Sequence, residues 1–264
     1  MKKILTTALR TIVAIILMLL PFFPITENFF PPENQVNNQT FLKYILLCLG
    51  IVVIGFGLIS FLKKSNPISG WLLFAIGMIA IFPLHLGPPR EDALLLTFSS
   101  IEKFRYGMLL ISILFLVLAG LKIWEGTKNT LIKITIAFLA ITALLNIWDN
   151  FSSFMFSSNM QDWISTGKNA NDFFKQFDYN IIWRTMARIS LYISAVLIAF
   201  ALVQQTKVKK WQFALMTVFC LIGITFCGLF CVKGFQYYFP FMVPAIALAP
   251  SYWIGLALLS NKKA

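Results

Sequence analysis

The sequence predicts an all-α polytopic integral membrane protein with eight transmembrane helices, and three observations support this. First, 59% of its 264 residues are hydrophobic and only 12% are charged, which leaves too little polar surface to cover a water-soluble domain. Second, the apolar residues gather in uninterrupted runs of about 20, the length that a helix needs to cross a hydrocarbon core. Such runs favour helices over the alternating strands of a membrane barrel. Third, the basic residues are unevenly divided between the two sides of these runs.

The eight predicted spans form a single transmembrane domain over residues 1–264. In chain order they cover residues 8–25, 42–62, 68–87, 105–124, 130–149, 182–203, 211–232 and 237–260. Connections on one side are short, which makes consecutive helices antiparallel neighbours. On the other side we expect outer loops at 26–41, 88–104 and 150–181. The last of these holds two short candidate helices, Met160–Ser165 and Asn171–Phe177, and the second fits an interfacial helix.

The charge distribution predicts the orientation. Thirteen of the 22 Lys and Arg residues fall on the side of the short connections, with Glu125 as the acidic residue beside them. The other side carries nine basic and nine acidic residues. Because basic segments stay in the cytoplasm, we expect both termini to be cytoplasmic and the protein to lie in the cell inner membrane. The lysines stand in small groups at helix ends, which argues against a nucleic-acid partner. The thirteen residues are Lys2, Lys3, Arg10, Lys63, Lys64, Lys122, Lys128, Lys133, Lys207, Lys209, Lys210, Lys262 and Lys263.

The two halves of four spans resemble each other weakly. The segment TALRTIVAIIL from Thr7 aligns loosely with TLIKITIAFLA from Thr130. In each half a long outer loop precedes an inward helix that ends in a lysine pair. A tandem repeat of four plus four parallel spans would produce this pattern, and such repeats build many transporters. Membrane topology alone also produces half of it, so both explanations stay open.

Three polar side chains are predicted to lie inside the outer leaflet, where a charged group costs roughly 2.5–3.5 kcal/mol at mid-depth. Arg188 is fifteen residues above Val203, which is about 22 Å at ~1.5 Å per residue. Arg184 is one turn higher on the same face. His85, the only histidine, reaches a similar height on the third helix just after Pro83, which should loosen that helix.

These residues define a candidate ligand-binding vestibule. In the ligand hypothesis both arginines face the bundle, Asp149 pairs with one of them, and the remaining positive charge receives a phosphate or a carboxylate. In one alternative the arginines extend to outer headgroups while His85 hydrogen-bonds a neighbouring helix. In another, His85 and Asp149 relay protons. The candidate residues are Arg184, Arg188, His85, Asp149, Arg90 and Arg105.

Prolines are predicted to interrupt the last helix. Pro240, Pro244 and Pro250 should break its hydrogen bonds at the outer end and near mid-membrane, leaving carbonyls such as that of Ile246 without their usual donor. Interrupted helices expose backbone dipoles to cargo in many transporters. Kinked helices with a purely structural role are commoner.

Neither a cofactor nor a metal is expected. Cys220, Cys227 and Cys231 share one face of the seventh helix, but they lack neighbouring histidine or acid and are interpreted as packing residues. With one histidine and no acid predicted deep in the bilayer, the chain offers little for acid–base catalysis. The sequence therefore favours a function other than catalysis, and an enzymatic function stays open as an alternative.

The sequence favours a permease-like bundle with an outward-facing site for a small anion or a lipid headgroup. That function predicts that Arg184, Arg188 and His85 point inward. The first alternative is a non-catalytic subunit that docks other membrane proteins or further copies of itself, with a filled core and an exposed aromatic face. The second alternative is a lipid-modifying enzyme that uses His85, Glu91 and Asp92. In every case the lipid bilayer is a partner.

Overall fold

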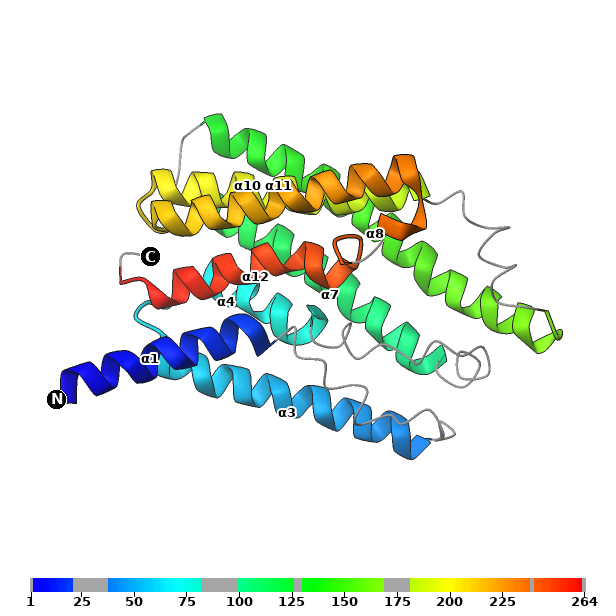
Figure 1. Cartoon of the computed structure of the whole chain (residues 1–264), viewed down its shortest axis with the longest axis horizontal. Coiled ribbons are helices and arrows are strands. Elements are labelled where there is room, and N and C mark those ends of the chain that lie inside the picture. Colours follow the sequence, from blue (N-terminus) through cyan, green and yellow to red (C-terminus); the bar gives the residue numbers. More distant parts are fainter. Residues whose placement is uncertain are drawn as a thin grey trace.

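The computed structural model describes residues 2–20, 38–81, 99–125, 130–168, 181–237 and 240–262. These parts of the chain are 89% helical and contain no strand. The helices lie side by side in an elongated bundle (Figure 1). In chain order they are α1 (Lys2–Leu19), α3 (Asn38–Leu62), α4 (Ile68–Ile76), the π-helix η2 (Gly77–Ile81), α7 (Ser99–Trp124), α8 (Thr130–Ser165), α10 (Ile181–Gln204), α11 (Lys210–Lys233), the 3₁₀-helix η4 (Phe235–Tyr237) and α12 (Pro244–Ser260).

Five of these helices are long and apolar enough to cross a membrane, which makes this a membrane protein. Their apolar segments agree with five of the predicted spans to within three residues. The other three predicted spans correspond to shorter apolar helices, Thr6–Leu19, Ile68–Ile81 and Pro244–Ser260, so the count of eight stays a prediction. The five long segments are Leu42–Leu62, Lys103–Trp124, Lys133–Ser152, Ile182–Gln204 and Lys210–Lys233.

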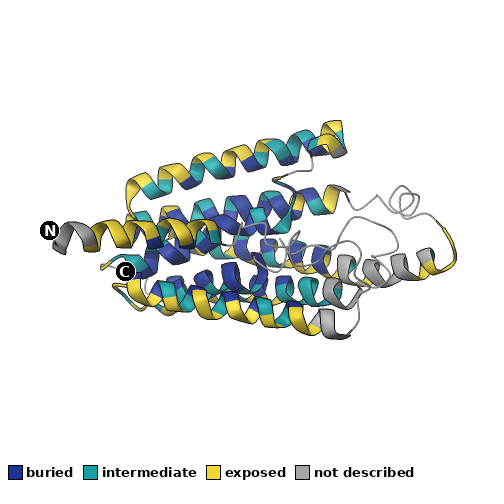
Figure 2. Cartoon of the chain, turned by 60° about the horizontal axis from the view of Figure 1, so that its bottom comes forward, coloured by how far each residue is buried: buried dark blue, intermediate teal, exposed yellow. Residues whose placement is uncertain are grey.

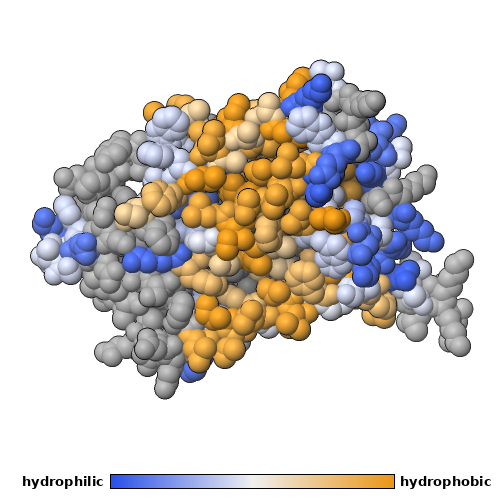
Figure 3. Space-filling model, turned by 180° about the vertical axis from the view of Figure 1, so that it is seen from behind, coloured by the Kyte–Doolittle hydropathy of each residue, from blue (hydrophilic) through white to orange (hydrophobic). Residues whose placement is uncertain are grey.

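On the face shown in Figure 3, apolar side chains form a belt across the middle of the molecule, and hydrophilic residues lie at both ends. Large apolar residues are exposed on several helices, among them Val53 on α3, Leu144 on α8 and Leu215 on α11. A continuous apolar surface of this extent is unfavourable in water. Contact with lipid tails accounts for it.

Basic residues collect at one end of the bundle, which we call the basic end. Its α3–α4 turn carries Lys63 and Lys64, and the Lys64 amide donates to the carbonyl of Leu259 near the end of α12. The α10–α11 turn lies beside it, because the Asn261 side chain donates to the carbonyl of Lys207. The start of α1 and the end of α12 lie at this same end (Figure 1). We call the opposite end the distal end.

α12 and the α4–η2 segment form the centre of the bundle, where buried residues concentrate (Figure 2). Glycines allow this close packing. A Cβ atom at Gly255 would lie 2.4 Å from the backbone nitrogen of Phe74, and one at Gly77 would lie 2.2 Å from the ring of Tyr252. Small residues at such crossings are typical of helix packing in membranes.

α8 is longer than the fifth predicted span. Its 36 residues run past Asp149 into the segment 150–181, which was expected as an outer loop. Met160–Ser165 is the end of this helix and not a separate one, while Asn171–Phe177 lies outside the described residues. Residues 150–165 contain neither glycine nor proline, so nothing breaks the helix. At ~1.5 Å per residue α8 is about 54 Å long, and its last turns extend beyond a ~30 Å hydrocarbon core.

The described part of the third predicted span passes from regular into irregular helix. α4 passes at Gly77 into the π-helix η2, and the described helix ends at Ile81, two residues before Pro83. The widened turn is consistent with the loosening expected near that proline, which cannot continue the backbone ladder. Residues 82–98, which include His85 and Arg90, lie outside the described residues.

The last helix begins later than residue 237, because the prolines shape its start. α12 has Pro244 at its first position, where the missing amide hydrogen costs nothing. A turn at residues 240–243 precedes it. Pro250 lies inside the helix, so the Ile246 carbonyl lacks the amide that would normally donate to it.

Candidate functional site

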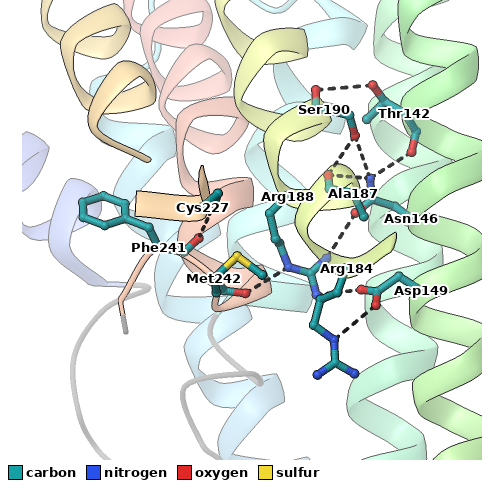
Figure 4. Close-up of polar contacts among 10 residues, drawn as sticks. All are labelled: Thr142, Asn146, Asp149, Arg184, Ala187, Arg188, Ser190, Cys227, Phe241 and Met242. Carbon is teal, nitrogen blue, oxygen red and sulfur yellow. Dashed lines mark hydrogen bonds and ion pairs between the residues drawn. The ribbon is translucent and has the colours of Figure 1, made fainter. Parts of the chain in front are cut away.

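A cluster of buried polar side chains joins α8 to α10 toward the distal end (Figure 4). Arg188 is six residues inside the apolar segment Ile182–Gln204, which is about 9 Å from its distal boundary at ~1.5 Å per residue. Its side chain is 3% exposed and that of Asp149 is 4% exposed. Charged groups at this depth cost several kcal/mol unless they are paired, so their partners determine what the cluster can do.

The Arg188 guanidinium makes contacts in three directions. Its Nη2 lies 2.7 Å from Oδ2 of Asp149, and its Nη1 donates to Oδ1 of Asn146 at 3.4 Å. Its Nε donates to the backbone carbonyl of Met242 at 3.0 Å. The planar fork of donors in arginine suits such a set of acceptors. Arg188 therefore ties α8, α10 and the turn before α12 to one another.

Asp149 also faces a second arginine. Nε of Arg184 lies 3.4 Å from Oδ1 of Asp149, and the Arg184 side chain is 29% exposed. The two terminal nitrogens of Arg184 point away from Asp149 (Figure 4). Two guanidinium groups and one carboxylate give this ion cluster of Arg184, Arg188 and Asp149 a formal charge of +2 − 1 = +1.

Polar contacts continue from the ion cluster toward the middle of the bundle. Asn146 Nδ2 donates to the Thr142 carbonyl at 2.8 Å and to Oγ of Ser190 at 3.4 Å. The hydroxyls of Thr142 and Ser194 are 2.7 Å apart. Thr142, Asn146 and Asp149 share one face of α8, because spacings of four and three return to the same side of a helix. This polar face fixes the register between α8 and α10.

The turn at residues 240–243 presents its backbone carbonyls to α10. The carbonyl of Met242 accepts from Arg188, and that of Phe241 accepts from the Tyr192 hydroxyl at 2.9 Å. Arg188 and Tyr192 are four residues apart and therefore adjacent on one face of α10. Carbonyls outside a helix need donors within a membrane. Here the protein's own side chains supply them.

The cysteines of α11 lie near this turn. Cys220 and Cys227 are buried, whereas Cys231 is exposed, and none of them forms a disulfide. Cys227 Sγ is 3.9 Å from the Phe241 carbonyl. Within the described ranges, no three His, Cys, Asp or Glu side chains are grouped so that they could hold a metal ion.

Three of the six predicted site residues meet in the ion cluster, namely Arg184, Arg188 and Asp149. Arg105 is a half-buried residue of α7. It follows Phe104, whose ring meets that of Tyr44 on α3 at 5.9 Å. The remaining two, His85 and Arg90, lie outside the described residues.

Sequence reasoning missed the polar partners that hold the ion cluster. A signal for Thr142 was available, since it stands one turn from Asn146 on the same face of a predicted span. Ser190 and Ser194 repeat that spacing on α10 and could have been matched to it. The carbonyl of Met242 could not have been found, because every residue has a carbonyl and only the packing of α12 brings this one to Arg188.

No protein-family model, curated protein or solved structure matches the chain. Its function must therefore be inferred from the chemistry of the ion cluster itself. That chemistry consists of two guanidinium groups around one carboxylate, set among apolar helices.

Proposed function

We propose that this protein is a permease-like helical bundle that binds an anionic group at its distal end. The observation that carries the proposal is that two guanidinium groups share one carboxylate. Guanidinium groups beside apolar helices attract an anion more strongly than they would in bulk water. A phosphate or a carboxylate suits their paired donors.

The two arginines have different roles in this proposal. Arg188 is buried and holds the carboxylate in place, so it is a positioning residue. Arg184 is 29% exposed, and its terminal nitrogens point to the side opposite Asp149 (Figure 4). Because a guanidinium can bind an oxyanion through two parallel hydrogen bonds, Arg184 is the residue that contacts the ligand.

The direction of the site follows from the positive-inside rule. If the basic end lies in the cytoplasm, as that rule requires, the distal end and Arg184 face the outside of an inner membrane. The ligand is then either an anion in solution or the phosphate of a lipid headgroup in the outer leaflet. Eight spans with both termini inside belong to this same proposal.

Thermal unfolding of the purified protein in neutral detergent tests the proposal. Inorganic phosphate and a short-chain phosphatidylglycerol are the two probes. A ligand at a hundred times its Kd stabilises the folded state by about 2.7 kcal/mol, so at least one probe should raise the Tm. Arg184→Gln should abolish most of that shift. A response to phosphate alone indicates a soluble anion, and a response to the lipid indicates a headgroup.

A matched control is available on α1. Arg10 is exposed, and its guanidinium lies over the ring of Phe61 at 5.8 Å, far along the chain from α8 and α10. Arg10→Gln should therefore leave the ligand-induced shift intact. If neither probe raises the Tm of the unmodified protein, or if Arg184→Gln keeps the full shift, the proposal is wrong. If a probe does bind, uptake of radiolabelled phosphate into proteoliposomes distinguishes transport from binding alone.

A further inference from the structure

Two turns at the basic end carry lysines that no described acid neutralises. The α3–α4 turn, and the α10–α11 turn with the first residue of α11, contain five lysines and neither Asp nor Glu, so their formal charge is +5. Among the described residues none of the five forms an ion pair, whereas Lys122 pairs with Glu125 at the same end. The five are Lys63, Lys64, Lys207, Lys209 and Lys210.

Both turns are fixed to the same end of α12. The amide of Lys64 donates to the carbonyl of Leu259 at 2.8 Å. Nδ2 of Asn261 donates to the carbonyl of Lys207 at 2.7 Å. Because Leu259 and Asn261 are two residues apart, one helix end holds the two groups of lysines in a set arrangement. The lysines therefore belong to a built surface, although they are far apart in the sequence.

Exposed apolar side chains border each lysine turn. Phe61 and Ile68 lie on either side of the α3–α4 turn, Trp211 directly follows the α10–α11 turn, and all three are exposed. The ammonium group of Lys63 lies over the ring of Trp71 at 5.4 Å. Lysine and tryptophan together at the edge of an apolar surface are typical of the headgroup level of a membrane. A lipid can contact the charges and the apolar side chains at once, which a soluble polyanion cannot.

From these observations we infer that the basic end binds a diphosphatidyl lipid, with one phosphate at each lysine turn and its acyl chains on the apolar surface beside them. Basic surfaces between membrane helices suit such headgroups. Once one phosphate is bound, the second is held near the other turn at a high effective concentration. The site lies at the end opposite the ion cluster and does not depend on the proposed function.

The positive-inside rule also accounts for lysines at one end, but it makes a different demand. Orientation requires only charges near the helix ends, so any anionic lipid would interact with them in proportion to its charge. Two turns fixed to one helix end favour two linked phosphates over the same number of separate ones. A preference at equal charge therefore separates the two explanations.

Thermal unfolding of the purified protein in neutral detergent tests the inference. The probes are tetraoleoyl cardiolipin, which has two phosphates, and dioleoyl phosphatidylglycerol, which has one, at the same total phosphate concentration. Cardiolipin should raise the Tm, and phosphatidylglycerol should give roughly half of that shift or less, because it cannot link the two turns. Dioleoyl phosphatidylcholine, which has no net charge, controls for a general effect of lipid.

Variants of the lysines locate the site. The double substitution Lys63→Gln with Lys64→Gln should reduce the cardiolipin shift to that of phosphatidylglycerol, because one phosphate then has no partner. Lys209→Gln with Lys210→Gln should do the same from the other turn. Lys122→Gln is the matched control, since this lysine stands at the same end but pairs with Glu125, and it should keep the full shift. If one double variant does not fold, the other still decides.

Equal shifts from the two anionic lipids would overturn the inference, because charge alone would then explain them. A loss in Lys122→Gln as large as that in the double variants would overturn it too. The lipid comparison is repeated in Arg184→Gln, which removes the proposed anion contact at the distal end. A cardiolipin preference that persists there, in a protein that does not respond to inorganic phosphate or short-chain phosphatidylglycerol, would support this inference and reject the proposed function.

Discussion

Arg188 is a charged residue that the bundle has nearly removed from solvent, and its partners explain how this is tolerated. Bringing two charges out of water costs several kcal/mol for each ion, and their attraction offsets this only when the other hydrogen bonds are also made. Arg188 meets that condition through Asn146 and the carbonyl of Met242. The pair therefore specifies how three helices meet more than it adds net stability.

This view predicts that removing one of the two buried charges destabilises the protein more than removing both. Arg188→Met leaves Asp149 and the Met242 carbonyl without their closest partner, so the free energy of unfolding should fall by about 3–5 kcal/mol. Adding Asp149→Leu should restore most of the loss, because neither buried charge then remains. Unfolding by SDS in mixed micelles measures both. A double variant as unstable as the single one would contradict the prediction.

Lys122 supplies the control for that experiment. It pairs with Glu125 at 2.8 Å, but the two side chains are 43% and 64% exposed. Lys122→Met should change the free energy of unfolding little, because exposed ion pairs contribute little to stability.

The sequence predicted part of this cluster for a clear physical reason. Charged residues within an apolar run must face a partner, and the helical rise gives their depth, so Arg184, Arg188 and Asp149 could be brought together in advance. Which arginine would be buried could not be predicted. That depends on the turn at residues 240–243, whose carbonyls fix Arg188 and leave Arg184 half-buried.

Among the helices, α1 has a backbone carbonyl near its end that a proline leaves without its usual donor, and a side chain from a distant helix donates to it instead. The carbonyl of Leu17 would normally accept from the amide of residue 21, but that residue is Pro21 and has no amide hydrogen. The hydroxyl of Tyr252 on α12 donates to this carbonyl. Next to it, Trp253 Nε1 donates to the Met18 carbonyl at 3.4 Å. α12 thus completes the hydrogen bonding at the end of α1.

Tyr252→Phe should therefore loosen the attachment of α1. The variant keeps the packing of the ring against Gly77 but leaves the Leu17 carbonyl without its donor, which should cost about 1–3 kcal/mol. The shift in the SDS unfolding midpoint measures this. Tyr237→Phe is the control, because the contacts described for Tyr237 are made by its ring, with Phe226 and Lys233. Equal effects of the two substitutions would show that the hydrogen bond from Tyr252 to the Leu17 carbonyl contributes nothing to stability.

Helix ends were less predictable from sequence than helix positions. The five long apolar segments agree with the prediction because burial in hydrocarbon sets their length. The extension of α8 to Ser165 was missed, because a helix outside the hydrocarbon can be polar and only a breaker would have ended it. The start of α12 was placed too early, since residues 237–243 are as apolar as the helix that follows them.

For the molecule as a whole, the arrangement of charge depends on the fold. Lysines that are far apart in sequence, on the α3–α4 turn, the α10–α11 turn and the end of α12, come together at the basic end. The ion cluster lies toward the other end, with Arg188 inside the apolar segment of α10 and about 9 Å from its distal boundary at ~1.5 Å per residue. If the positive-inside rule decides the orientation, the proposed anion site must open to the outside.

Labelling of single cysteines in intact cells tests that orientation. With the four native cysteines replaced by alanine, one new cysteine is placed at exposed Ser165, at the distal end of α8, or at exposed Lys209, on the α10–α11 turn. A maleimide that cannot cross the membrane should label Ser165→Cys directly, but Lys209→Cys only after the cells are made permeable. Lys209→Cys removes a single lysine of the basic end, so the charge bias that orients the bundle persists. The opposite labelling pattern would put Arg184 on the cytoplasmic side, and an outward-facing site would then be impossible even if the ion cluster binds anions.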